Sequence, residues 1–298
     1  MKKNFYILFL LGMLLVSIQA IGQKTVVVVE PDEGIEIGAL NNAITSASDP
    51  GNSIFELRRG GTYLLNGSVS HEGYELHIRA EDGDGLRPVL QPAVDELGSS
   101  SIPFTPGGDL TLESLYVTGK DELGALQSRI IVASGDGNRI IVEDCFFDYT
   151  RQTFLRLGSS NNKVYIRNSI LRNSFRPENP DNGRTFDLRG NPQDTISIEN
   201  STLYNNSGTI FRTGGAFTKY LNLDHSTIFQ VHLERLPIDL NTTLVANVTN
   251  NIFYNVGLSG DSYQHSPLFA TDSIYTIGEF TDADRFFNLT NNNWYTQQ

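Results

Sequence analysis

The sequence predicts an all-β fold, a single-stranded parallel β-helix, in which the chain winds into a solenoid behind one short capping helix. Two observations predict it. A motif of alternating apolar residues followed by two polar residues, as in ISIENSTL at 196–203, occurs seven times. A repeat every 20–50 or so residues is typical of solenoids, and an apolar alternation of period two is typical of strands rather than helices.

Aligning the seven copies produces three columns. The first polar column is Ser114, Asp144, Asn168, Asn200, His225, Asn250 and Asn291. The second is Leu115, Cys145, Ser169, Ser201, Ser226, Asn251 and Asn292. An apolar column follows, with Val117, Phe147, Leu171, Leu203, Ile228, Phe253 and Trp294.

Stacked strands place the members of a column beside one another on successive coils. We therefore expect Asn168 and Asn200 to lie on adjacent coils, with their side chains inside the turn. Leu203 should be buried between Leu171 and Ile228. The alternative is a β-sandwich with chance similarity between copies, which would need hairpin turns of the Asn-Gly or Asp-Gly type. Such turns do not join the copies systematically.

The N-terminus has the pattern of a secretory signal peptide at residues 1–22. Lys2 and Lys3 precede the apolar run 7–18, and Ala20-Ile21-Gly22 reads as a cleavage site. The run is short for a membrane span, and no other run approaches the required length of about 18 residues. We expect a secreted protein, in the periplasm, on the outer surface or outside the cell, with a single β-helix domain at 23–298.

Charge and cysteine content exclude several classes of function. Removing Lys2 and Lys3 leaves 20 basic against 34 acidic residues, a net charge near −14. Such a chain is not expected to bind nucleic acid or anionic membrane surfaces. Cys145 is the sole cysteine, so no internal disulfide can form. Its place in the second column indicates a packed small residue rather than a nucleophile. The oligomeric state stays open.

Both ends of a β-helix need covering, because its terminal strands expose unpaired backbone groups. Residues 35–48 form an amphipathic pattern with Ile35, Leu40 and Ile44, and we predict the N-terminal capping helix there. Residues 257–286 interrupt the repeat. They are either an inserted loop or a C-terminal cap.

The first coils resemble a known family. A helix, then Gly60-Gly61-Thr62-Tyr63, then a strand ending Ile78-Arg79-Ala80-Glu81 is similar to the first coils of the pectin-lyase-like right-handed β-helix proteins, of the alginate lyase and chondroitinase B type. Over residues 25 to 92 the resemblance rests on these motifs, and over the rest of the chain it rests on the repeat pattern alone. The chain also resembles secreted bacterial members of that group. It implies a right-handed coil and a polysaccharide as partner.

The resemblance also implies a Ca²⁺ site of Asn and closely spaced Glu, with a Lys base followed by an Arg. No Glu-x-Glu precedes a Lys-Ser here, so the sequence predicts no metal site and no cofactor; Ca²⁺ stands on the resemblance alone. Lys219 and Arg212 are the fragments that could serve a uronate, with Arg binding the carboxylate and Lys taking a proton.

A row of charged residues is the candidate ligand site. After each of four successive repeat copies we expect a further strand whose central residue is charged and lies between apolar residues. These central residues are Arg156, Asp187, Arg212 and Asp239. We expect them exposed on one face, beneath the polar loop 175–184. A second such row precedes the first polar column: Glu113, Glu143, Arg167, Glu199 and Asp224. Either row can be a stack of cross-strand ion pairs without a ligand.

Three functions remain open. The first is a secreted protein that binds an acidic polysaccharide at the cell surface or outside the cell. The second is a polysaccharide lyase with a divergent site around Arg212 and Lys219. The third is a structural or adhesive solenoid. Glycan binding separates the first from the third, and product formation is required by the second.

Overall fold

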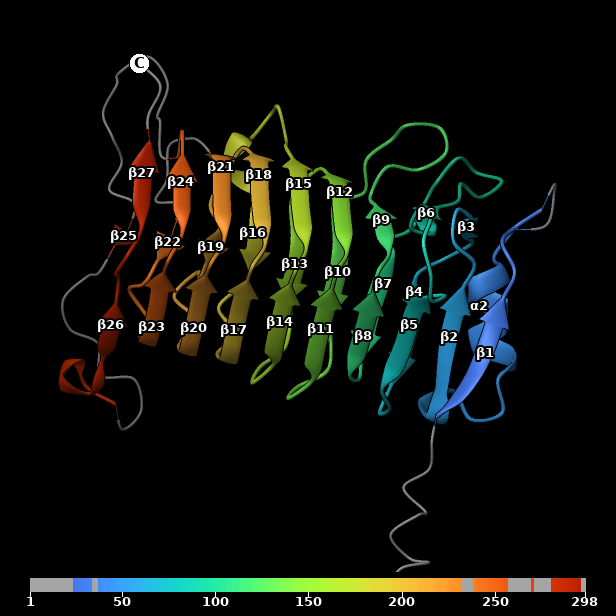
Figure 1. Ribbon diagram of the computed structural model, residues 1–298, viewed down its shortest axis with the longest axis horizontal. Helices are drawn as coiled ribbons and strands as arrows, with labels where there is room; N and C mark the ends of the chain where they lie inside the picture. The colour runs from blue at the N-terminus through green and yellow to red at the C-terminus, as the bar shows by residue number, and fades with distance from the viewer. Residues whose placement is uncertain (1–23, 34–36, 232–237, 257–268, 271–279, 296–298) are drawn as a thin grey trace, which may run out of the picture.

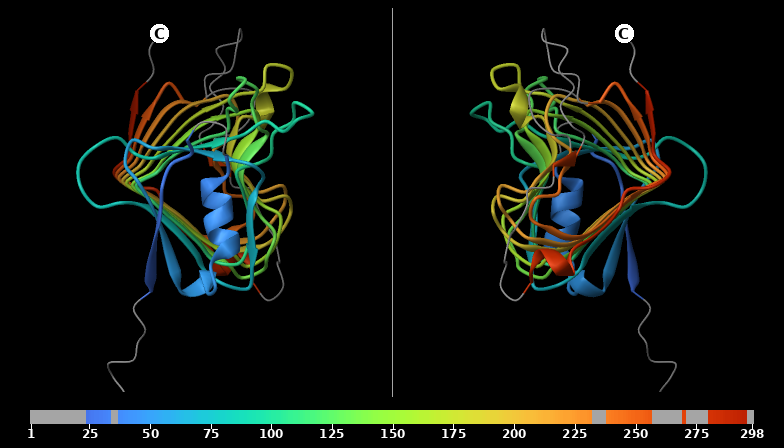
Figure 2. Two further views of the ribbon diagram at one scale, coloured as in Figure 1. Left: turned by 90° about the vertical axis from the view of Figure 1, so that its right-hand side faces the viewer. Right: turned by 90° about the vertical axis from the view of Figure 1, so that its left-hand side faces the viewer.

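The structure, a computed structural model, describes residues 24–33, 37–231, 238–256, 269–270 and 280–295. Three parallel sheets run along the length of the molecule, and each coil adds one strand to each sheet in turn (Figure 1). The views along the axis show the coils stacked in register around a common interior (Figure 2). The predicted right-handed parallel β-helix is confirmed, and the β-sandwich alternative is wrong.

Strands that follow one another in a sheet belong to successive coils. Sheet A, in the described residues, consists of β1 (Thr25–Val29), β2 (Ser53–Leu57), β5 (Leu76–Ala80), β8 (Leu110–Glu113), β11 (Arg139–Glu143), β14 (Lys163–Arg167), β17 (Gln193–Glu199), β20 (Thr218–Asp224), β23 (Thr243–Thr249) and β26 (Phe286–Asn288). Sheet B consists of β3 (Thr62–Leu65), β6 (Val89–Pro92), β9 (Tyr116–Thr118), β12 (Phe146–Thr150), β15 (Ile170–Ser174), β18 (Thr202–Asn206), β21 (Thr227–Val231), β24 (Ile252–Tyr254) and β27 (Asn293–Tyr295). Sheet C consists of β4 (Val69–Glu72), β7 (Phe104–Gly107), β10 (Arg129–Ala133), β13 (Thr153–Leu157), β16 (Arg184–Asp187), β19 (Phe211–Arg212), β22 (Ile238–Asp239) and β25 (Phe269–Ala270).

Helix α2 (Ala39–Ser46) lies at the N-terminal end of the solenoid, within the predicted range 35–48. It packs against β1, β2 and β3, and buries Leu40 and Ile44 in the core. Seen along the axis, the helix lies across the interior of the first coils (Figure 2). Its two apolar residues are four apart and therefore share one face, which explains why so short a helix can cover the end.

The first polar column forms the turn between sheets A and B. All seven of its residues have a left-handed backbone, with φ between 48° and 57°. Asn, Asp and Ser tolerate or favour such turns, because their short side chains bond locally. Asn168 and Asn200 lie on adjacent coils as predicted, and the Asn200 amide donates to Asn168 Oδ1. Both are exposed, so their expected placement inside the turn is wrong.

The second column supplies the interior side chains of this turn. None of the first-column residues is buried, whereas the next residue on each coil up to Asn251 is buried. Four buried polar side chains there each accept a hydrogen bond from a backbone N–H of the coil before: Ser169 from Cys145, Ser201 from Ser169, Ser226 from Ser201, and Asn251 from Ser226. The Cys145 thiol is fully buried, which raises its pKa to about 12. It is a packed residue, as expected.

The apolar column builds the core of sheet B. Leu203 pairs with Leu171 on one side and with Ile228 on the other, and it is fully buried. The predicted register of the repeat is therefore confirmed at its centre. The last member, Trp294, pairs with Phe253 and stacks on its ring at 4.8 Å between centroids.

The interval 257–286 contributes a strand to the solenoid. Within it, β25 pairs in parallel with β22 and extends sheet C. The 3₁₀ turn Asp282–Asp284 then leads into β26. Residues 257–268 and 271–279 lie outside the described residues, as does the predicted signal peptide 1–22. Among the helices in the described part of the chain, none is long and apolar enough to cross a membrane.

Candidate functional site

The register of sheet C places the four predicted ligand residues in one row. Arg156 on β13 pairs with Asp187 on β16, which pairs with Arg212 on β19. Phe211 pairs with Ile238, so Asp239 on β22 takes the next place in the same row. The order along the solenoid is the one that the sequence predicts.

Asp187 differs from the prediction, because its side chain is only 1% exposed. Its Oδ2 lies 3.2 Å from Arg156 Nη2 and 3.6 Å from Arg184 Nη1, and its Oδ1 lies 3.2 Å from Arg212 Nη1. Three guanidinium groups therefore close over one carboxylate. The expected exposed acid is in fact a buried counter-ion for three arginines, of which Arg212 is the most accessible.

Asp239 has a different environment from Asp187. Its Oδ2 accepts a hydrogen bond from the Thr213 hydroxyl at 2.7 Å, and its Oδ1 accepts from the Asn241 N–H at 3.1 Å. Within the described residues it forms no ion pair with Arg212. The alternation of signs along the row therefore ends at Arg212, and the expected chain of ion pairs does not continue to Asp239.

The cluster extends beyond the predicted row. Arg129 on β10 and Arg184 on β16 both pair with Thr153 in register, on either side of β13. Arg129 donates to Gln152 Oε1 at 2.8 Å and to Ser128 Oγ at 3.0 Å. The arginine cluster thus comprises Arg129, Arg156, Arg184 and Arg212, of which the last three contact Asp187. Four arginines beside one acid are unusual in a chain whose net charge is −12.

The electrostatics of the cluster favour an added anion. Burial, and next the charge of Arg156, lower the pKa of Arg129 to about 10. Burial also lowers the pKa of Arg156, against the opposing effect of Asp187, and Arg189 lowers it further. The Nε atoms of Arg129 and Arg156 are buried and have no hydrogen-bond partner among the described residues. Unpaired buried donors and crowded like charges both raise the free energy of the free protein.

The two residues considered for catalysis are not brought together. Arg212 lies on sheet C against Asp187, whereas Lys219 is an exposed residue of β20 at the start of sheet A. The turn 213–217 separates the two strands. The two side chains therefore belong to different sheets of the coil.

The second predicted row lies on sheet A in the expected register. Arg167 lies between Glu143 and Glu199 in this row, with its Nε 3.7 Å from Glu199 Oε2. A guanidinium group in the middle of the acids repels a cation, so these residues do not suit the Ca²⁺ that the family resemblance implies. Across the described residues, no group of three or more His, Cys, Asp or Glu is placed to hold a metal ion.

A groove of about 560 Å³ lies at the corner between sheets B and C. The loop 175–183 and the segment Ala125–Leu126 form its walls, and Tyr149, Arg151, Asn173 and Asn205 line it. Phe175 and Pro177, from the loop that we expect above the charged row, border this corner. The sequence does carry a signal for the groove, since Tyr149, Asn173 and Asn205 each follow a first-column residue by five positions.

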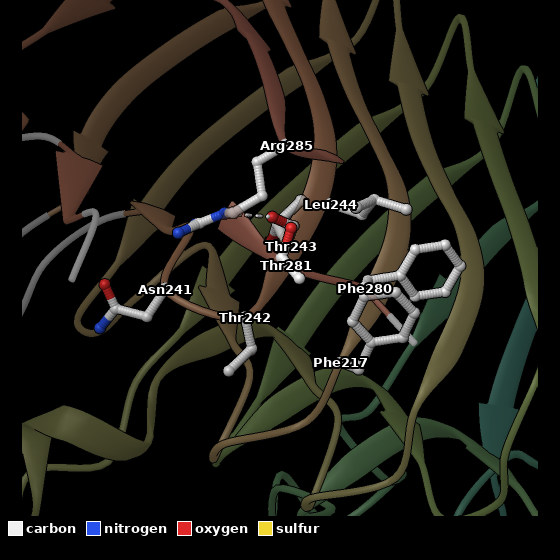
Figure 3. A pocket seen from close by; sticks show the side chains of 8 residues that line it. All are labelled: Phe217, Asn241, Thr242, Thr243, Leu244, Phe280, Thr281 and Arg285. Atoms are coloured by element: carbon white, nitrogen blue, oxygen red, sulfur yellow. Dashed lines mark hydrogen bonds between the residues drawn. The ribbon is translucent and has the colours of Figure 1, made fainter. Parts of the chain in front are cut away.

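A second, much smaller cavity lies beneath Phe280 and is lined by residues that include Phe217, Thr243 and Arg285 (Figure 3). The rings of Phe217 and Phe280 stack at 5.7 Å, and Arg285 donates to the backbone oxygens of Thr243 and Leu240. Its volume of about 10 Å³ holds at most about one water molecule. These contacts attach the last coil to the solenoid, and the cavity is too small for a ligand.

Comparison with known proteins identifies the fold. No protein-family model and no curated protein matches the chain. Among solved structures it is similar to the PL6 family alginate lyase AlyGC, with a TM-score of 0.53 and 15% sequence identity. The match covers 92% of this chain and 40% of that enzyme, so the chain spans less than half of the enzyme's length. With the sheet topology, this likeness shows a parallel β-helix, and at this identity it shows the fold alone.

Proposed function

We propose that this β-helix protein is secreted and binds an acidic polysaccharide through the arginine cluster on sheet C. The observation that carries the proposal is the contact of three arginines with one buried carboxylate, with a fourth, Arg129, on the next strand of the same sheet of an acidic protein. A guanidinium group binds a carboxylate through paired, charge-assisted hydrogen bonds. The signal-peptide pattern at residues 1–22 supports a place where such polymers occur.

The spacing of the cluster suits a repeating polyanion. Arg156 and Arg212 lie two coils apart in one row, and coils follow one another at about 4.8 Å, which separates the two by about 10 Å. Carboxylates along a polyuronate recur at distances of this order. The structural neighbour AlyGC is named as an alginate lyase, and alginate is a polyuronate, which supports uronates as the class to test.

A lyase is the second candidate, and the fold likeness to a lyase favours it. Cleavage by that route needs a base that takes a proton beside the bound carboxylate. Lys219, the base considered from the sequence, lies on another sheet from the cluster. Binding without cleavage is therefore the function that the described residues support best.

The test compares binding and cleavage on the same probes. Calorimetry with tetramannuronate should detect binding that weakens with added salt, because exposed charges are screened. Arg156→Ala/Arg212→Ala should weaken it by at least about tenfold, since each lost charge-assisted bond contributes about 1.5–3 kcal/mol. Arg79→Ala/Arg167→Ala is the matched control, because it removes the same charge from sheet A.

Two results decide between the functions. If the sheet C variant and the sheet A variant bind equally well, the arginine cluster is not the site. If ultraviolet absorbance of an unsaturated product grows with time and is lost in Lys219→Ala, the protein is a lyase.

A further inference from the structure

The turn between sheets B and C contains one aromatic residue, which its backbone does not favour. Five residues at equivalent places have left-handed backbones: Tyr149, Asn173, Asn205, Gln230 and Asn255, with φ between 50° and 65°. Asn adopts this conformation at low cost, whereas a bulky aromatic residue there is a true outlier. Strain of this kind persists only where the surrounding structure enforces it, and such residues cluster at functional sites.

The neighbours of Tyr149 form the hydrogen-bonded stack that the turn favours. Asn205 Nδ2 donates to Asn173 Oδ1 at 2.6 Å, and Asn173 Nδ2 donates to Asp148 Oδ1 at 2.7 Å. In the described residues Tyr149 takes no part in a side-chain hydrogen bond. Tyr149 thus gives up what an Asn at this place could gain.

In return, Tyr149 places an aromatic ring in the corner groove. Its side chain is 40% exposed, and Phe175 in the wall is 47% exposed. The groove volume of about 560 Å³ lies within the usual range for small-ligand sites. Exposed aromatic faces beside amide groups suit a sugar, because a pyranose ring has an apolar C–H face and polar hydroxyls at its rim.

The charges around the groove point to an acidic sugar. Arg151 lines it and forms no hydrogen bond or ion pair through its guanidinium group with the residues that the structure describes. Lys120 Nζ lies 5.7 Å from the centre of the Tyr149 ring. Glu178 in the adjoining loop pairs with Arg176 at 3.4 Å, and its pKa is lowered mainly by a backbone hydrogen bond. Arg151 and Lys120 are therefore available to a carboxylate.

We propose that the corner groove is a separate subsite for one uronate residue. Tyr149 and Phe175 pack against the sugar ring, Arg151 binds its carboxylate, and the amides of Asn173 and Asn205 bind its hydroxyls. The choice of a uronate rests on the proposed function, whereas the aromatic platform rests on the turn geometry alone.

The test is the substitution Tyr149→Asn, which should change stability and binding in opposite directions. Asn relieves the backbone strain and can join the stack with Asn173, so the thermal midpoint should rise. Loss of the ring should weaken tetramannuronate binding by about tenfold or more. Gln230→Asn is the matched control: it makes the same kind of change at φ 50° outside the groove lining, and should stabilise without altering affinity.

A neutral probe separates the ring from the charge. β-1,4-Mannotetraose has the stereochemistry of tetramannuronate without its carboxylates. Arg151→Ala should reduce the preference for the acidic probe by about tenfold, while Tyr149→Asn should weaken both probes. An unchanged affinity for both probes in Tyr149→Asn overturns the subsite.

Failure of the subsite and failure of the proposed function give different results. Loss of binding in Arg156→Ala/Arg212→Ala but not in Tyr149→Asn overturns the subsite and leaves the arginine cluster. The reverse pattern overturns the arginine cluster and leaves the subsite. A wild-type protein that binds neither probe overturns both.

Discussion

Replacing the buried carboxylate of the arginine cluster should strongly destabilise the protein. Asp187→Asn keeps the shape of the side chain and removes the charge that Arg156, Arg184 and Arg212 face at 3.2–3.6 Å. Removing one partner of a buried ion pair costs about 3–5 kcal/mol. The Arg212 and Arg156 side chains are 32% and 19% exposed, so water screens part of the repulsion that remains. We therefore expect a loss of about 3 kcal/mol, at the lower end of that range.

The assay is urea denaturation followed by circular dichroism, at low and at high sodium chloride. Part of the loss should disappear at high salt, because ions screen the uncompensated arginines. Asp239→Asn is the matched control on the same sheet. Its two hydrogen-bond donors are the Thr213 hydroxyl and the Asn241 backbone N–H, and the oxygen of the new amide can still accept from one of them. The free energy of unfolding should therefore fall by only about 1 kcal/mol. Equal losses in the two variants would refute the view that Asp187 is the counter-ion of the cluster.

The remaining predictions concern the core and the pH dependence of stability. Leu203→Ala removes a fully buried side chain and should cost about 2–5 kcal/mol in the same denaturation assay; a loss below about 1 kcal/mol would contradict the register. Burial lowers the pKa of His71 against the opposing effect of the Asp109 carbonyl. As the pH falls, His71 in the unfolded chain takes up a proton at a higher pH than His71 in the folded protein. The free energy of unfolding therefore has its full value above about pH 6.5 and decreases as the pH drops toward the folded pKa. Relative to His71→Gln, the wild type should lose stability between about pH 7.5 and pH 5.5, and a constant difference would exclude His71 as the cause. The binding variants Arg156→Ala/Arg212→Ala and Tyr149→Asn complete the set.

The coils could be predicted because their signals are local. An apolar residue at every second position indicates a strand and shows which of its residues face the core. A step of 24–32 residues between most copies gives the number of residues in one coil. The first polar column could be aligned because each coil needs a left-handed residue at the same turn. Its side chains were expected inside because amide ladders were assumed to be interior. In the structure Asn168 and Asn200 are exposed at left-handed positions, and Ser169 and Ser201 occupy the interior.

The sequence by itself determined the β-helix, the row from Arg156 to Asp239, and the place of the capping helix, since these depend on spacing along the chain. Only the tertiary structure decided that Asp187 is buried, because its burial depends on side chains from three successive coils that close over it. The same holds for Arg129, which joins the cluster from another coil, and for the groove at Tyr149. That groove is formed by loops of irregular length, and no periodicity predicts how a loop folds over its neighbours.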